Sequence, residues 1–365
     1  MLDDTLLDDP RALAALDTRG VLRSAATAGA QVRSAAHSAL EAGVADLGHH
    51  HRPRALVLLR RPGASASSTA LLVALLGPEC PVPVVVAESA PTWIGPLDVL
   101  VAHTDDGTDV DLADSVALAV RRGAEVVLSA PAEGPVASAG AGRMRLVEPR
   151  IPVPPGLDLP RALAVGLAVL RALGLLSAPL DPAMDVLADQ LDAEAERNQP
   201  AHEQFMNPAK SLALRLAEHT PLLWGTDPLA AAVARHAAAS LAAHAGIVAH
   251  AGSVAEGVAA FGLVRALDRV GGARDVFHDP FDDPAPGSEP LPLRLVLVAT
   301  GEDDPGQAVL RRTGRTLPEG DLLHPVDEIA RGVPHSALLR AALLASRVDV
   351  AAVYLGLATR TIEPA

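Results

Sequence analysis

The sequence predicts an α/β protein whose parallel sheets are covered by helices on both faces. Short runs of apolar, often β-branched residues alternate with longer segments in which apolar residues recur at helical spacing. Apolar runs without polar alternation are typical of parallel strands that are buried on both faces. This alternation occurs twice along the 365 residues, so we expect two copies of one architecture.

The clearest unit is residues 55–77, ALVLLRRPGASASSTALLVALLG. Residues 55–59 predict a buried strand, residues 63–68 a turn of small residues, and residues 69–76 a helix that ends at glycine and proline. Such a unit can present free backbone N–H groups to an anion. Small residues also let a helix pack close to a sheet, so ligand binding and packing both remain open here.

The other expected elements follow in chain order. In the first half, strands are expected at 82–87, 99–103, 124–129 and 144–147, and helices within 8–45 and at 111–122 and 160–176. A polar helix at 181–196 could bridge the halves, and Asn207-Pro208 begins the next helix. In the second half, strands are expected at 222–224, 247–250, 293–300 and 322–329, helices at 228–245, 253–270, 307–313, 336–347 and 350–358, and an acidic loop at 277–289.

Composition argues against several classes of function. The formal net charge of -14 argues against nucleic acid or an anionic membrane as the main partner, and aromatic residues at 2% are too few for base stacking. A single cysteine, Cys80, excludes an internal disulfide framework and a cysteine zinc site. The acidic N-terminus lacks a signal-peptide pattern, and the longest apolar run is too short for a bilayer. We expect a cytoplasmic protein.

Three stretches carry a resemblance to a known family. Asn207-Pro208-Ala209-Lys210 matches the start of that family's second domain, and Pro160-Arg161-Ala162-Leu163 matches the helix that closes the first. Residues 349–364, DVAAVYLGLATRTIEP, match its C-terminal helix and final Ile/Val-Glu-Pro. In these residues the chain resembles the sugar isomerase (SIS) family, and within it the two-domain bifunctional phosphoglucose/phosphomannose isomerases and their degenerate TobH-type relatives.

The resemblance covers nearly the whole chain and implies two tandem SIS domains, each a Rossmann-like or flavodoxin-like three-layer sandwich. It implies an N-terminal SIS domain with a leading helix at 1–180, a helical linker at 181–206, and a C-terminal SIS domain of the bacterial phosphoglucose isomerase type at 207–365. Family members form dimers in which both subunits build the site, so a homodimer is expected. No cofactor is implied.

The resemblance also implies a sugar-phosphate site. The family's first turn reads Gly-Gly-Ser, where this chain has Gly63-Ala64-Ser65. The family's third-strand turn, Ser-Tyr-Ser-Gly-Asn-Thr-Glu-Glu-Thr, corresponds to residues 103–111, HTDDGTDVD, which keep only the threonine, at Thr108. The implied substrate-binding residues are Gly63, Ser65, Thr108 and Arg161.

The altered turn changes the expected electrostatics, because His103 and Asp105 stand where the family has serines. A sugar phosphate carries about -1.5 to -2 charges. At about 5 Å and an effective dielectric of about 20, each carboxylate–phosphate charge pair costs about 3 kcal/mol. Asp105, Asp106 and Asp109 could instead hold a cation. A solvated acidic helix start is the alternative that we expect, so no metal site is predicted.

The family's catalytic residues are largely replaced. Its isomerase reaction needs a carboxylate base and a histidine for ring opening, and these fall at Ala243 and Ala259. The family's C-terminal lysine falls at His335, and only Arg161, which stabilises the enediolate in the family, remains. If the register slips by one or two residues, the substitutes would be His244, His250 and Glu256. Otherwise we expect half-exposed histidines and a solvated glutamate.

Three functions follow as hypotheses. The leading one is a phosphosugar-binding SIS protein with decayed catalytic residues, acting in binding or regulation within carbohydrate-derivative metabolism. The second is an active aldose–ketose isomerase with relocated residues, an intramolecular oxidoreductase acting on glucose 6-phosphate and mannose 6-phosphate. The third is a structural subunit that binds no sugar.

Overall fold

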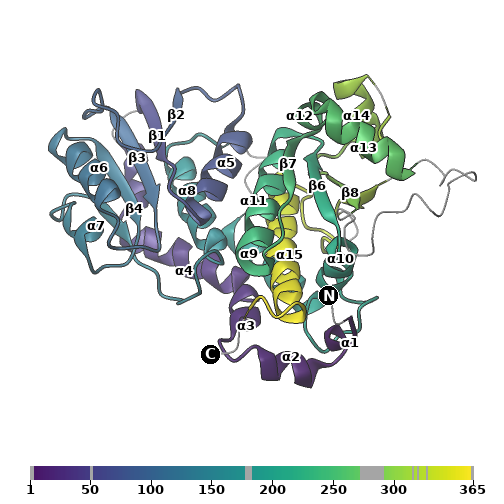
Figure 1. Cartoon of the computed structure of the whole chain (residues 1–365). Coiled ribbons are helices and arrows are strands. Elements are labelled where there is room, and N and C mark those ends of the chain that lie inside the picture. Colours follow the sequence, from purple (N-terminus) through teal and green to yellow (C-terminus); the bar gives the residue numbers. More distant parts are fainter. Residues whose placement is uncertain are drawn as a thin grey trace, which may run out of the picture. The chain divides into compact units, whose positions relative to one another are not determined.

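The computed structural model describes residues 4–49, 52–176, 183–271, 292–314, 316–318, 320–325 and 328–362. The chain divides into two compact units (Figure 1). The N-terminal unit comprises Arg23–Glu196 and Asp327–Ser346, and the C-terminal unit comprises Met1–Leu22, Arg197–Val326 and Arg347–Ala365. Each unit thus draws on more than one part of the chain. The domain bounds 1–180, 181–206 and 207–365 stay a prediction.

The N-terminal unit is built on a five-stranded parallel sheet of order β2-β1-β3-β4-β5. Every residue of β1 and β3 is buried, which explains why both strands are continuous apolar runs. In the register, Leu56 of β1 aligns with Val84 on one side and Val99 on the other. The strands are β1 (Ala55–Leu59), β2 (Val84–Ala87), β3 (Asp98–His103), β4 (Glu125–Ser129) and β5 (Arg145–Val147).

Helices cover both faces of this sheet (Figure 1). Leu112 and Val116 of α6 lie in one core cluster with Val57 and Leu100 of the sheet. On the other face, α5 and α8 pack against the sheet and against each other. The helices described for this unit are α3 (Val21–Ala25), which begins in the other unit, α4 (Ala28–Glu41), the 3-10 helix η1 (Val44–His49), α5 (Ala64–Leu76), α6 (Val110–Arg121), α7 (Pro135–Ser138), α8 (Leu159–Ala172) and α9 (Met184–Arg197).

The C-terminal unit repeats the plan with a four-stranded parallel sheet of order β7-β6-β8-β9. Leu222 and Trp224 of the sheet form a core cluster with Val254 and Val309, while α11 packs on β6, β7 and β8. The strands are β6 (Thr220–Gly225), β7 (His250–Ser253), β8 (Leu293–Val298) and β9 (Asp321–Leu323). The helices are α1 (Asp4–Leu7), α2 (Pro10–Leu16), α10 (Pro208–Leu216), α11 (Pro228–Ala245), α12 (Val254–Ala259), α13 (Phe261–Gly271) and α14 (Pro305–Thr313).

The order β7-β6-β8-β9 is the order β2-β1-β3-β4 over again. The predicted α/β class, with a parallel sheet and covering helices in each half, is therefore confirmed. The order 2-1-3-4-5 is that of flavodoxin-like sheets.

The chain ends in α15 (Ala337–Ala358), a continuous helix of 22 residues. The expectation of two helices, at 336–347 and 350–358, was wrong. Asp349, at the expected break, is buried and accepts a hydrogen bond of 2.7 Å from Ser240. By length and composition α15 could cross a membrane, but its apolar window is 100% buried inside the protein, as in the core helix of a globular fold.

Other element boundaries also differ from expectation. The expected turn at 63–68 is wrong, because α5 already begins at Ala64. The expected strand at 247–250 is displaced to His250–Ser253, and Val248 is 80% exposed. The expected helix at 253–270 is interrupted at Ala260, whose backbone angles are φ -79° and ψ 68°. The acidic loop at 277–289 lies outside the described residues.

Candidate functional site

Each sheet has one place where the chain reverses its direction of winding, and ligands of open α/β sheets bind at the carboxyl ends of the strands there. In the N-terminal unit this place lies between β1 and β3, and in the C-terminal unit between β6 and β8. Gly63 and Thr108 lie in the turns that follow β1 and β3, and Ser65 lies in the first turn of α5. These segments therefore define the candidate site.

Gly63 is the N-cap of α5 and has φ 78°, a conformation that favours glycine. Ser65 lies in the first turn of the helix and is only 1% exposed. Its hydroxyl donates to the Leu59 carbonyl at 3.1 Å and accepts from the Arg61 backbone N–H at 3.1 Å. The hydroxyl of Ser65 thus ties the turn to the end of β1, and its role in binding a substrate stays a prediction.

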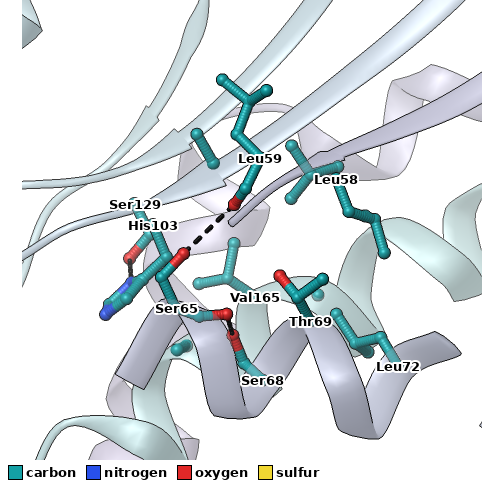
Figure 2. A pocket seen from close by; sticks show the side chains of 13 residues that line it. Leu58, Leu59, Ser65, Ser68, Thr69, Leu72, His103, Ser129 and Val165 are labelled. Atoms are coloured by element: carbon teal, nitrogen blue, oxygen red, sulfur yellow. Dashed lines mark hydrogen bonds between the residues drawn. The ribbon is translucent and has the colours of Figure 1, made fainter. Parts of the chain in front are cut away.

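Figure 2 shows the small cavity beside Ser65. It lies between the sheet and helices α5 and α8, and its volume is about 10 Å³. A cavity of about 10–15 Å³ holds one water molecule, whereas small-molecule sites measure about 300–1,000 Å³. Ser65, Ser68, Thr69, His103 and Ser129 supply its polar lining. The cavity therefore has room for a water molecule and not for a sugar phosphate.

A buried hydrogen-bond network joins the ends of β3 and β4 to α8. The Nδ1 atom of His103 lies 2.9 Å from Ser129 Oγ, a contact visible in Figure 2, and its Nε2 atom lies 2.7 Å from Asp158 Oδ2. Arg161 donates to the same Asp158 oxygen at 3.1 Å. Asp158 stands at the N-cap position of α8 but makes no capping bond with its side chain. His103 is therefore part of an internal network.

The network fixes the charge of Asp158 and the position of Arg161. Burial of Asp158 favours the neutral acid, but the hydrogen bond and charge of His103 and the charge of Arg161 outweigh burial and hold the pKa of the carboxyl below its usual value. Arg161 is 8% exposed, and its Nε has no hydrogen-bond partner among the described residues. Of the predicted site residues, Arg161 alone belongs to this network.

Thr108 lies on the surface of the turn after β3. Its hydroxyl donates to Asp106 Oδ1 at 2.6 Å, and its backbone N–H donates to the same oxygen at 2.8 Å. These bonds lower the pKa of Asp106. Asp105 is exposed. Within the described part of the chain, no group of three or more His, Cys, Asp or Glu side chains is placed to hold a metal ion.

A salt bridge that the sequence did not predict joins the turn after β1 to the turn after β3. Arg61 donates to Asp109 from Nε at 2.8 Å and from Nη2 at 2.9 Å, and both side chains are largely buried. Asp109 also caps α6 by accepting from the Leu112 N–H at 3.0 Å. Asp109 is therefore neither a free carboxylate nor a cation ligand here. Its partner, Arg61, is the second residue after β1 in the sequence, which was the available signal.

In the C-terminal unit a carboxylate likewise joins two turns at the switch point, the place between β6 and β8 where the chain reverses its direction of winding. Asp227, the N-cap of α11, accepts from the Ala230 N–H at 2.9 Å. It also accepts from the Thr300 N–H at 3.1 Å, the Thr300 hydroxyl at 2.7 Å and the Gly301 N–H at 3.2 Å. One carboxylate thus binds the turn after β6 to the turn after β8. The sequence signal was Asp before Pro228 at a helix start.

The positions expected to correspond to the family's acid and base carry exposed methyl groups. Ala243 lies near the end of α11 and Ala259 at the end of α12, and both are exposed. Glu256 forms a capping box with Ser253 and an ion pair of 2.9 Å with Arg235. These contacts, led by the backbone N–H of Ser253, lower the pKa of Glu256, which weakens it as a base.

The two histidines named as possible substitutes are also bonded or buried within the fold. His250 Nδ1 accepts a hydrogen bond of 3.0 Å from the Trp224 indole. His244 is 7% exposed, and burial lowers the pKa of its imidazole. The expectation of half-exposure is therefore confirmed for His250, which is half-buried, and wrong for His244, which is buried. His335 is exposed and immediately precedes Ser336, which caps α15 through a 3.1 Å bond from the Leu339 N–H.

Residues 205–364 match the family described as the bacterial phospho-glucose isomerase C-terminal SIS domain. No curated protein matches the chain significantly. The chain is similar in structure to a proposed phosphosugar isomerase from Silicibacter pomeroyi, with TM-score 0.60, 17% identity, and coverage of 94% of this chain and 99% of that one.

Two further solved structures are similar. The C-terminal domain of glucosamine-fructose-6-phosphate aminotransferase from Francisella tularensis has TM-score 0.59 and 10% identity, with 92% and 96% coverage. A proposed phosphosugar isomerase from Bacillus subtilis has TM-score 0.55 and 15% identity, with 90% and 95% coverage. At these identities the likeness concerns the fold, which in each case extends over both units.

The paired parallel sheets and these comparisons define an α/β protein with the tandem SIS fold of phosphosugar isomerases. Residues 205–364 match the C-terminal SIS domain of bacterial phosphoglucose isomerases, and the likeness of the fold extends over both units.

Proposed function

We propose that this protein is a member of the bifunctional glucose-6-phosphate/mannose-6-phosphate isomerase family, of the degenerate TobH type, that has lost isomerase chemistry and binds a sugar phosphate in a regulatory role. The observation that carries the proposal is the pair of alanines at 243 and 259. A methyl group transfers no proton, and general acid–base catalysis contributes about 10²–10⁴-fold. Glu256 and His250, the accessible titratable neighbours, are engaged in capping, an ion pair and an indole bond.

Retained cationic and hydroxyl groups support binding. Arg161 is held in place by Asp158, and its Nε has no hydrogen-bond partner in the part of the chain that the structure describes. Gly63, Ser65 and Thr108 remain at the switch-point turns, and the similar solved proteins are named for phosphosugar or hexosamine-phosphate chemistry. The proposal includes a homodimer, a cytoplasmic location, and no nucleic-acid or membrane partner. Sedimentation at micromolar concentration tests the dimer, and a monomer would contradict it.

A thermal-shift panel of glucose 6-phosphate, mannose 6-phosphate and fructose 6-phosphate tests the binding proposal. A ligand at tenfold its Kd stabilises a protein by about 1.4 kcal/mol, which corresponds to about 3–6 °C for a unit of this size. We expect Arg161→Ala to abolish the shift while Arg171→Ala, a second arginine on α8, leaves it unchanged. Equal shifts in both variants would place the ligand elsewhere.

A specific observation favours a second candidate, a structural subunit that binds no sugar. Both switch points are closed by internal carboxylates, Asp109 paired with Arg61 and Asp227 bonded to Thr300 and Gly301. If no sugar phosphate at millimolar concentration shifts the wild-type melting temperature, the structural subunit becomes the better account.

A further inference from the structure

A shallow cavity of about 300 Å³ lies at the amino ends of β1 and β3, on the sheet edge opposite the switch-point turns. It is lined by residues 93–97, which lead into β3, together with Arg54, which precedes β1, and Arg122, which follows α6. Its volume is at the lower end of the range for small-molecule sites. Nothing in the proposed function uses this edge of the sheet.

The fully buried carboxylate of Asp98 holds the guanidinium of Arg54, the first of two cations that line this cavity. Asp98 is 0% exposed and accepts from Arg54 Nε at 3.0 Å and from Arg54 Nη2 at 2.5 Å. The Gly95 N–H donates to the same carboxylate at 2.9 Å, and Arg54 Nη2 also reaches the Trp93 carbonyl at 3.2 Å. These bonds hold the guanidinium in one orientation. A group held in advance loses little entropy when a ligand binds.

The fixed guanidinium lies over an exposed indole. The Arg54 guanidinium carbon is 5.5 Å from the centroid of the Trp93 ring, within the range of cation–π contacts. Trp93 is nevertheless 47% exposed, and Leu97 beside it is 52% exposed. The chain has only two tryptophans, and the other, Trp224, is 0% exposed. The cavity thus offers a rigid aromatic surface in a protein with very few aromatic residues.

Arg122 provides the second cation. It is the C-cap residue of α6 and is exposed at the cavity. Asp98 balances the charge of Arg54, whereas Arg122 makes no ion pair with any described residue. The cavity therefore carries about one uncompensated positive charge, although the whole chain has a formal net charge of -14.

We infer that this cavity binds a small planar anion, an aromatic or heterocyclic ring that bears a carboxylate or a phosphate. The ring stacks on the indole of Trp93 beside the Arg54 guanidinium, and the anionic group pairs with Arg122. Stacking and a charged hydrogen bond each contribute roughly tenfold or more to affinity. A sugar phosphate without a planar ring uses only one of the two contacts, so this site is distinct from the proposed sugar-phosphate site.

Tryptophan fluorescence of the full chain tests the inference, because Trp224 is buried and Trp93 dominates any ligand response. The probes are AMP and benzoate, which combine ring and anion, with adenosine as the ring alone and ribose 5-phosphate as the anion alone. We expect saturable quenching by AMP or benzoate, and binding of both fragments at least about tenfold weaker. A response to AMP alone identifies a phosphate ligand, and one to benzoate alone a carboxylate ligand.

Matched variants locate the ligand. Arg122→Ala should weaken binding of the responding probe about tenfold or more, whereas Arg121→Ala, the exposed neighbour that does not line the cavity, should leave it within twofold. The inference is overturned if neither AMP nor benzoate quenches saturably, if a fragment binds equally well, or if the two variants behave alike. It is also overturned if Trp93→Ala converts a dimer to a monomer in sedimentation, because the surface would then be a self-association face.

Discussion

Asp158 is the residue on which the buried network of the N-terminal unit depends. It accepts from His103 at 2.7 Å and from Arg161 at 3.1 Å, and it is 2% exposed. Breaking a buried charged pair by removing one partner costs about 3–5 kcal/mol, because the other charge is left unpaired. Asp158 therefore stabilises the fold and also orients the arginine on which the binding proposal rests.

We predict that Asp158→Asn lowers the free energy of unfolding at pH 7 by about 3 kcal/mol. The pKa of Asp158 is lower in the folded state than in the unfolded state, where it is about 3.9. Its stabilisation is therefore fully present above about pH 4 and is lost as the pH falls through the folded-state pKa. Urea unfolding of wild type and variant between pH 3 and 7 measures this.

In that experiment the difference between wild type and Asp158→Asn should shrink as the solution becomes more acidic. Asp105→Asn, which changes an exposed carboxylate, serves as the control and should unfold like the wild type at pH 7. A difference between wild type and Asp158→Asn that stays constant across the pH range would contradict the charged-pair account.

Helix α11 and helix α15 approach each other closely at Gly356. A Cβ atom on Gly356 would lie 2.1 Å from the backbone carbonyl oxygen of His244. Backbone atoms cannot move aside as flexible side chains do, so the helices would have to shift. The same pair of helices shares the buried polar contacts of Asp349 with Ser240 and His236.

We predict that Gly356→Ala destabilises the protein by about 1–3 kcal/mol, the usual cost of overpacking a core. Gly262→Ala is the matched control, because Gly262 lies in α13 and a Cβ atom there meets nothing within 4 Å. The control should be neutral or stabilised by up to about 1 kcal/mol. Thermal unfolding of both variants measures the effect, and equal melting temperatures would refute the close approach.

Strands β1 and β3 were predictable because each is a buried apolar run, and β1 was predicted with its observed bounds, whereas the half-buried strand β7 was displaced. The helix boundaries were less predictable from the sequence. Ser65 and Ser68 resemble loop residues in sequence, yet the Ser65 hydroxyl donates to the Leu59 carbonyl and the Ser68 hydroxyl to the Ser65 carbonyl, which lets α5 include them. Asp349 likewise resembles a helix break in sequence, because the sequence does not show that Ser240 and His236 of α11 contact its carboxylate.

The candidate site was less predictable than the fold. Sequence comparison indicated Ser65, Thr108 and Arg161, but it could not show which hydroxyls the chain itself uses. His103 and Asp158 are 55 positions apart, and the Arg61–Asp109 pair is separated by 48. Pairings over such distances depend on the strand order β2-β1-β3-β4-β5, which brings separate turns to one sheet edge. No local pattern encodes them.

For the whole molecule, two sheets of matching strand order and a family match over residues 205–364 establish the fold, while the chemistry of an isomerase depends on individual side chains. Under the proposal, the alanines at 243 and 259 would remove proton transfer, and the carboxylates near Thr108 would oppose a phosphate. These losses affect different steps, binding and proton transfer, so their effects on the rate of isomerisation should multiply. The proposal of a non-catalytic SIS protein is the consequence.

The most direct test incubates the purified protein with fructose 6-phosphate and follows glucose 6-phosphate and mannose 6-phosphate by coupled assays. We predict no product above the protein-free control, because neither aligned position can carry a proton. Turnover near the enzyme median of about 10 s⁻¹ would contradict the account. In that case His244, His250, Glu256 and His335 are the residues whose replacement should abolish it.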